Sequence, residues 1–155
     1  MKSKNSQDVS INPDICECIG FLATQMRDWI SSTFDEGIRT YNLNYQQAGI
    51  LWRCYQEPCC QVRLCRLVKV DKNYVRFLID DLEQKGLVYR FKNPKNRKEN
   101  LICLTQRGAE VCQKTFALML KTQEDLLQSA LNQDQIKTLH SLLLRVFESI
   151  KSKKD

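Results

Sequence analysis

The sequence contains few of the residues that build catalytic and metal centres. It has one histidine, His140, and five glycines among its 155 residues. It lacks a glycine-rich phosphate loop, a nucleophile matched to a base, and a ligand motif for a metal ion. Eight cysteines are present, but their spacing forms no ladder of CxxC pairs and gives no support for zinc. We therefore expect neither an enzyme nor a bound metal or cofactor.

The chain also lacks a long hydrophobic run. No stretch approaches the ~20 apolar residues that a helix needs to cross a bilayer. The first ten residues, MKSKNSQDVS, are polar and lack the apolar stretch of a signal peptide. We expect a cytoplasmic protein with no membrane partner, built as one globular domain after a disordered segment at residues 1–12.

What the chain does have is an uneven distribution of charge. Its formal net charge is +6. Residues 61–100 hold 11 Lys and Arg against 5 Asp and Glu, so this segment accounts for the whole excess. A localised basic segment is typical of a surface that binds a polyanion, although it can also be no more than a solvated face.

Capping residues divide the first part of the chain into helices. Asp14 predicts the start of a first helix with one apolar face, made of Ile15, Ile19, Leu22, Met26 and Trp29. The pattern weakens after Trp29, and we expect a loop around Gly37. Asn44, with Gln47 three residues later, has the capping-box spacing of a second helix. Residues 60–68 predict a short third helix.

The next segment has the order of a helix-turn-helix followed by a basic wing. Asp71 predicts the start of a helix over residues 72–85, which stops at Gly86. Strand-forming residues at 87–90 and 101–104 lie on either side of a basic loop. The expected fold is mainly α with a small two- or three-stranded β-wing.

Two longer helices complete the chain. Thr105 predicts the start of one that reaches about residue 130, and Asn132 with Gln135 predicts the start of the last. The last helix carries an apolar stripe: Ile136, Leu139, Leu143, Val146 and Ile150. This is more apolar surface than a small winged-helix core needs. We expect the terminal helices to bury it against a second subunit, the alternative being that they fold back on their own core.

The stretch VDKNYVRFLIDDLEQKGLVYRFKNPKNRKENLICLTQRG, residues 70–108, resembles the MarR family (multiple antibiotic resistance regulators). It combines a capped recognition helix, a KGLV turn, a basic wing and an LTxxG helix start, and the order of elements agrees over nearly the whole chain. The resemblance implies one domain over 13–151. Within it, residues 44–108 form the winged-helix lobe, and residues 13–36 and 109–151 form the terminal helices, which dimerise.

The family usually forms homodimers that regulate transcription, often as repressors, with the recognition helix in the major groove and the wing in the minor groove. Arginine can form two hydrogen bonds to guanine, and asparagine can form two to adenine, whereas lysine neutralises phosphates. A wing-tip arginine suits the negative potential of a narrow minor groove. The DNA-contacting residues expected here are Lys72, Asn73, Tyr74, Arg76, Lys95, Arg97 and Lys98. Arg76 could instead pair with Asp80 on the helix surface.

Two positions depart from the family pattern. Asn96 stands where an aspartate commonly braces the wing arginine, which predicts a looser wing. Phe77 stands where the recognition helix has an arginine, and we expect its ring to cover part of the core. These departures are the only support for an alternative function, a winged-helix module that binds proteins without specific DNA binding.

The cysteines allow a sensing role. One branch of the family senses peroxides through a cysteine near the start of the first helix, where Cys16 and Cys18 lie. A helix N-terminus stabilises a thiolate, but Asp14 and Glu17 oppose its formation. The simpler interpretation is that the cysteines are small apolar core residues, although Cys59 and Cys60 lie near a loop and are expected to be exposed.

A small aromatic or phenolic effector is the other mode of control that the resemblance implies. Its pocket would lie between the dimer-forming helices and the winged-helix lobe, where the sequence offers Trp29, Tyr41, Tyr45 and Trp52. Aromatic residues at such positions are more often part of the core. The sequence and this resemblance thus predict a dimeric, sequence-specific regulator of transcription that acts as a repressor. It would bind double-stranded DNA at a pseudo-palindromic operator, and a ligand or cysteine oxidation would modulate its affinity.

Overall fold

The structure is a computed structural model that describes residues 14–153; the disorder expected for residues 1–12 lies outside them. The described helices are α1 (Ile19–Ile38), α2 (Tyr45–Gln56), α3 (Gln61–Val68), α4 (Lys72–Gln84), α5 (Gln106–Gln128) and α6 (Gln133–Lys151). The described strands are β1 (Cys59–Cys60), β2 (Val88–Lys92) and β3 (Asn100–Leu104). Short 3₁₀ helices span Ile15–Glu17 and Arg39–Tyr41. The fold is therefore mainly α with a small sheet, as the sequence predicts.

Four of the five predicted capping side chains begin α-helices: Asn44, Asp71, Thr105 and Asn132. Asp14 instead caps the 3₁₀ helix Ile15–Glu17, and α1 begins only at Ile19. Asn44 Oδ1 accepts a hydrogen bond from the Gln47 backbone N–H at 2.9 Å, and the Gln47 side chain accepts one from the Asn44 N–H at 3.0 Å. Asn132 and Gln135 form the same reciprocal pair at the start of α6. Thr105 Oγ1 accepts from the Gly108 N–H at 2.9 Å at the start of α5. Each cap satisfies backbone donors that have no partner within the helix.

The sheet has three antiparallel strands in the order β1-β3-β2. The first strand was not expected, since residue 60 was assigned to the third helix. Cys59 pairs with Ile102 and Cys60 with Leu101, and this pairing holds both residues extended, so α3 begins one residue later at Gln61. The same pairing makes the expected exposure of the two cysteines wrong, because Cys59 is buried and Cys60 partly buried.

The loop expected around Gly37 is also wrong. α1 continues through this residue to Ile38. A Cβ at Gly37 would lie 3.3 Å from a methyl group of Leu118 on α5, so the glycine allows α1 and α5 to approach closely. Tertiary packing keeps the residue helical here in spite of its low helix propensity.

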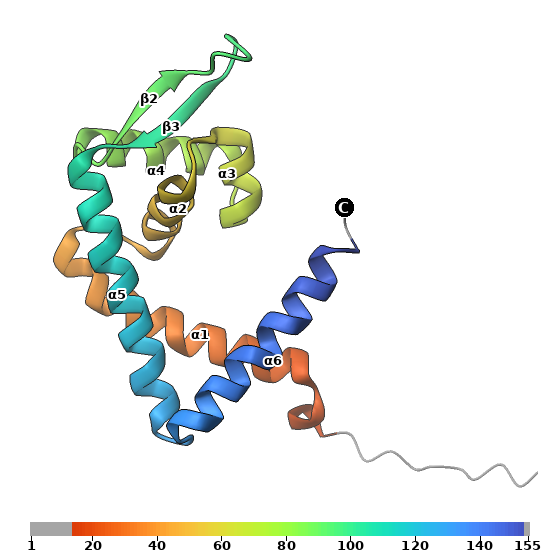
Figure 1. The fold of residues 1–155 in the computed structure, drawn as a ribbon. Coiled ribbons are helices and arrows are strands. Elements are labelled where there is room, and N and C mark those ends of the chain that lie inside the picture. Colours follow the sequence, from red (N-terminus) through yellow and green to blue (C-terminus); the bar gives the residue numbers. More distant parts are fainter. Residues whose placement is uncertain (1–13, 154–155) are drawn as a thin grey trace, which may run out of the picture.

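The core lies inside the winged-helix lobe and reaches only the nearest turns of α1 and α5. Figure 1 shows α2, α3 and α4 beneath the β2–β3 hairpin, with α5 leaving the lobe from the end of β3. The buried apolar cluster consists of Phe34, Ile38, Leu43, Ala48, Ile50, Leu51, Cys54, Cys59, Leu64, Val75, Leu78, Ile79, Leu82, Leu87, Val88, Ile102 and Cys112. All of it lies between residues 34 and 112.

The terminal helices extend away from that core. In Figure 1, α5 runs down from the lobe, α1 crosses α5 near its middle, and α6 turns back at the bottom. The main contact of α6 is with α5, and none of its side chains is buried. Along the described part of the chain, no helix is both long and apolar enough to span a membrane.

Candidate nucleic-acid interface

Helix α4 presents polar and aromatic side chains on the face opposite the core. Asp71 Oδ1 accepts hydrogen bonds from the backbone N–H groups of Asn73 and Tyr74 at 2.9 and 3.0 Å, which fixes the first turn. Val75 and its buried neighbours on α4 pack inward. The exposed residues of the first two turns are Lys72, Asn73, Tyr74, Arg76 and Phe77. These turns form the part of the helix that is free to enter a groove.

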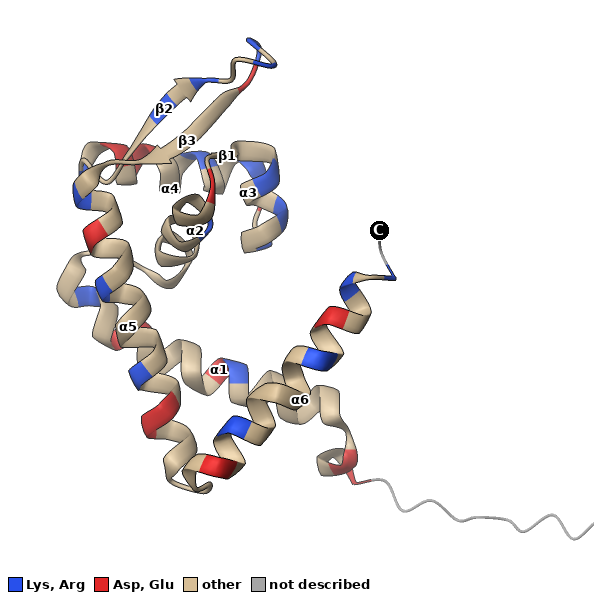
Figure 2. Cartoon of the chain, in the orientation of Figure 1, with Lys and Arg blue, Asp and Glu red and all other residues tan. Residues whose placement is uncertain are grey.

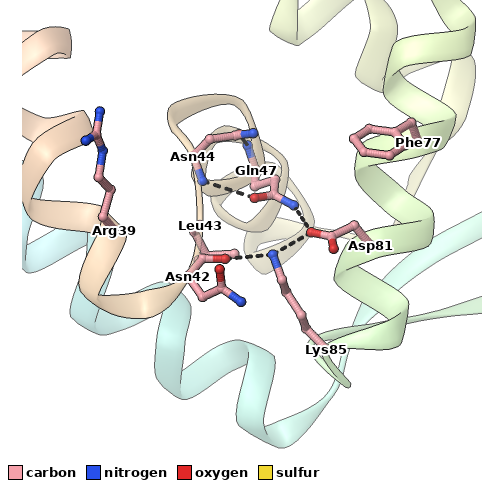
Figure 3. Close-up of a pocket in the computed structure, with 8 residues that line it drawn as sticks. All are labelled: Arg39, Asn42, Leu43, Asn44, Gln47, Phe77, Asp81 and Lys85. Atoms are coloured by element: carbon pink, nitrogen blue, oxygen red, sulfur yellow. Dashed lines mark hydrogen bonds and ion pairs between the residues drawn. The ribbon is translucent and has the colours of Figure 1, made fainter.

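A polar anchor joins the second half of α4 to α2 (Figure 3). The Gln47 side-chain amide and the Lys85 ammonium both donate to Asp81 Oδ2, each at 2.5 Å. Lys85 also donates to the Asn42 carbonyl oxygen at 2.6 Å. Burial alone would raise the pKa of Asp81, but the hydrogen bonds from Lys85 and Gln47 hold that pKa below its usual range. The anchor holds the second half of α4 against α2 and the turn that precedes it.

A second anchor joins α4 to the wing. The Arg90 guanidinium on β2 forms ion pairs with both Asp80 and Glu83, and Glu83 also accepts a hydrogen bond from the Arg90 backbone N–H at 3.2 Å. Arg90 is largely covered, so this arginine is occupied within the chain. Its role is to hold the hairpin against the recognition helix.

The wing tip is an ordered turn. Asn93 donates from its side chain to Glu99 at 2.8 Å and from its backbone to the Glu99 carbonyl at 3.0 Å. Asn96 Oδ1 accepts from the Lys98 N–H at 3.3 Å. The asparagine thus orders the backbone on either side of Arg97 without contacting its guanidinium. The looser wing expected from Asn96 finds no support in this hydrogen-bonded turn.

The 11 lysines and arginines of residues 61–100 fall into two groups. Four are paired with carboxylates: Arg63, Arg76, Lys85 and Arg90. The Arg76 contact, 3.9 Å from Asp80, is the surface pair considered for this residue, and it is long and exposed. Among the described residues, the other seven form no ion pair: Arg66, Lys69, Lys72, Lys92, Lys95, Arg97 and Lys98.

The unpaired cations gather on one part of the lobe. Figure 2 shows blue segments on α3 and at the wing tip. The red segments of α4 lie at the C-terminal end of that helix, beside β2. Arg66, Lys69 and Lys92 were not singled out from the sequence. The ion pairs identify them. Arg63 and Arg90 are bound to carboxylates, whereas these three cations are not, and so they contribute to the basic surface.

Phe77 is not a core residue, contrary to the expectation. Its side chain is 63% exposed, and its ring lies 6.2 Å from the Tyr74 ring, centroid to centroid, with an interplanar angle of 15°. A residue two positions after buried Val75 lies on roughly the opposite side of an α-helix, at about 100° per residue. Figure 3 shows the ring at the mouth of a polar cavity of about 300 Å³, above Asp81.

The four residues considered for an effector pocket do not all lie in one place. Tyr45 and Trp52 line one cavity of about 650 Å³ between α1, α2 and the end of α3, together with Phe116, Arg27 and Arg53. Trp29 is 65% exposed on α1, and Tyr41 packs against the core, so neither lines that cavity.

The cysteines also separate by position. Cys16 and Cys18 are exposed just before α1, and Cys18 occupies its N-cap position without a side-chain hydrogen bond to the helix. Cys54 and Cys112 are buried, and burial raises their pKa to about 12 and about 11. Within residues 14–153, no group of three or more His, Cys, Asp or Glu side chains is placed to bind a metal ion.

Three comparisons with known proteins agree on one family. Residues 43–99 match the family model described as "MarR family". The multiple antibiotic resistance protein MarR of Escherichia coli is 32% identical over 85 residues, covering 55% of this chain and 59% of that protein. The chain thus matches less than two thirds of the length of this relative. An uncharacterised HTH-type transcriptional regulator of Bacillus subtilis, YdcH, is 23% identical over 120 residues, covering 74% and 82% of the two chains.

The likeness in three dimensions is more extensive. The crystal structure of wild-type MarR in its apo form, from E. coli, superposes with a TM-score of 0.74 at 26% identity. The superposition covers 88% of this chain and 98% of that one. It includes the terminal helices, which the family model does not reach.

Proposed function

We propose that this chain, whose residues 43–99 match the MarR family model and whose fold is similar to that of E. coli MarR, is a DNA-binding regulator of transcription. The observation that carries the proposal is the group of seven cations that have no carboxylate partner within residues 14–153. They lie on α3 and just after it, at the start of α4, at the end of β2 and at the wing tip. Asp80, Asp81 and Glu83 on α4 are occupied by ion pairs within the chain. Two further carboxylates adjoin these cations: Asp71 caps α4, and Glu99 accepts a hydrogen bond from Asn93. The resulting surface is suited to a polyanion.

The individual roles follow from chemistry and position. In the proposed complex α4 enters the major groove, where Asn73 and Arg76 present hydrogen-bond donors to base edges. Arg97 extends from the hydrogen-bonded wing tip into the adjacent minor groove. Lys72, Lys95 and Lys98 neutralise phosphates and orient the lobe without reading sequence.

The proposed active form is a homodimer on a pseudo-palindromic operator. Its two recognition helices would lie ~34–36 Å apart, one helical turn of DNA. We assign dimerisation to residues 13–36 and 109–151 and DNA binding to residues 44–108. Exposed apolar side chains on α1 and α6, such as Ile19, Leu143 and Val146, support this division because residues 14–153 of one chain leave them uncovered.

We further propose that the protein is a cytoplasmic repressor whose DNA affinity responds to an effector. The cavity beside Tyr45 and Trp52 lies between α1 and the lobe, so a small aromatic ligand bound there would change the spacing of the two lobes. Oxidation of exposed Cys16 or Cys18 is the other route, since both lie at the start of α1.

Fluorescence anisotropy of the reduced protein tests the proposal. The probe is the duplex just upstream of its own gene, with a scrambled duplex of equal length as control. We expect preferential binding to the upstream duplex, with an affinity that falls ~10³-fold or more between about 50 and 200 mM salt. Equal weak binding to both duplexes with a shallow salt dependence would favour a protein-interaction module instead.

A further inference from the structure

The recognition helix carries an exposed pair of stacked aromatic rings. Tyr74 is 37% exposed and Phe77 is 63% exposed, and their planes are nearly parallel. They lie on consecutive turns of α4, directly beside Asn73 and Arg76. The pair therefore occupies the part of the helix that the proposed function assigns to the major groove.

Beyond its second turn, α4 offers DNA few hydrogen-bond donors. The next turn holds Asp80 and Asp81, whose negative charge is offset by Arg90 and Lys85 but which present no donors to DNA. Phosphates and base edges are thus accessible to the first two turns only. Phe77 is the last exposed residue before Asp80, since Leu78 and Ile79 are buried, and its ring would be among the groups closest to the bases.

A phenyl ring has no hydrogen-bond donor or acceptor to offer to a base edge. The apolar feature of the major groove is the C5-methyl group of thymine, which is absent from the other three bases. Contact with that methyl group removes apolar surface of both partners from water, and this surface is otherwise exposed on Phe77. Stacking on Tyr74 holds the ring in one orientation, so little side-chain freedom is lost on binding.

We infer that Phe77, positioned by Tyr74, is a specificity-determining residue that reads thymine methyl groups in each half of the operator. This inference rests on the proposed function, because it requires α4 to enter the major groove. It goes beyond that function in naming the base and the chemical group that the helix selects.

The experiment begins with selection from a randomised duplex library of about 20 base pairs, two half-sites long, with the full-length protein. We expect enriched sequences to carry thymine at a symmetric position in both halves. Each of these thymines is then replaced by deoxyuridine, which removes the methyl group and leaves every hydrogen-bonding group unchanged.

The wild-type protein should lose about fourfold in affinity per methyl group, or about 15-fold with one removed from each half. The Phe77→Ala variant should bind the thymine duplex as weakly as the wild type binds the deoxyuridine duplex, and should not distinguish the two. Phe77→Leu should retain part of the preference. Phe91→Ala removes a half-exposed phenylalanine from β2 and should behave as the wild type.

The results separate the two proposals. No enrichment of any sequence, together with a shallow salt dependence, would overturn both the proposed function and this inference. Enrichment of a sequence to which wild type and Phe77→Ala bind equally well, with or without the methyl groups, would overturn the inference alone. In that case Phe77 would serve the polar cavity beneath it rather than the DNA.

Discussion

The winged-helix lobe buries its apolar side chains within one chain, whereas the terminal helices leave theirs in solvent. Leu64, Leu78 and Ile102 in the lobe are 0 to 1% exposed. On α6, Leu143, Val146 and Phe147 are 46 to 62% exposed. The charge distribution is the reverse, since the lobe holds the basic excess and the rest of the chain is balanced. The lobe has its own buried core and carries the basic surface. The terminal helices have the composition of a surface that binds a second subunit.

The largest effect should come from the tight joint between β2 and α5. A Cβ at Gly108 would lie 1.9 Å from the Leu87 carbonyl oxygen, a backbone atom that cannot move aside alone. We expect Gly108→Ala to destabilise the lobe by ~3 kcal/mol or more, measured by urea unfolding, since relief requires α5 to shift.

Gly20→Ala is the matched control for that substitution. No atom lies within 4 Å of the position of its Cβ, and it lies in the exposed first turn of α1. Removing a helical glycine there should leave stability unchanged or raise it by up to ~1 kcal/mol. Equal losses from both substitutions would mean that the two regions are not packed as differently as described.

Charging the stripe on α6 should have the next largest effect. The double substitution Leu143→Glu and Val146→Glu places two like charges in the proposed dimer interface. We expect a monomer by light scattering and a loss of DNA affinity of about 100-fold, because two half-sites are no longer bound as one unit. Thermal unfolding of the lobe should change little, since both side chains are exposed in one chain.

Ser141→Glu adds charge to the polar side of the same helix and should remain dimeric. A fully dimeric double variant would show that the stripe is not the interface. The exposed apolar side chains of α6 would then need an explanation other than dimerisation.

Removal of the wing-tip cation should have a smaller effect, confined to DNA binding. Arg97→Ala should lower affinity about tenfold and reduce the slope of log K against log salt by about 1, without changing stability. Lys114→Ala, on the exposed surface of α5, should leave both quantities unchanged. An unaltered salt slope for Arg97→Ala would place the wing away from phosphate.

The smallest effect should appear at alkaline pH. Burial raises the pKa of Cys112 to about 11, so the unfolded chain releases this proton at lower pH than the folded one. The stability contributed by the neutral thiol is complete below about pH 9 and is lost as pH rises toward 11. At pH 10 the loss should be roughly 1 kcal/mol, and Cys112→Ala should unfold with a correspondingly weaker dependence on pH between 8 and 10.

Local signals in the sequence predicted much of the fold. Asn44, Asp71, Thr105 and Asn132 cap helices because capping depends on a side chain and the backbone two or three residues away. Misassigned positions depend on distant partners. Gly37 stays helical because Leu118 packs against it, and Cys59 and Cys60 become a strand because Leu101 and Ile102 pair with them.

The candidate site shows the same division. Charge counts located the basic segment, but they could not separate Arg90, which is held by Asp80 and Glu83, from Arg97, which has no carboxylate partner in residues 14–153. Comparison with the family pattern likewise assigned Phe77 to the core, whereas in the structure its ring is exposed beside Tyr74. Such distinctions need coordinates because they depend on which side chain reaches which partner.

The most direct test of the account is sedimentation velocity of the full chain, alone and with the selected operator duplex. The account predicts two chains per particle in both samples, since the apolar faces of α1 and α6 require a partner and the operator has two halves. A single chain that is stable alone and binds one duplex as a monomer would contradict it.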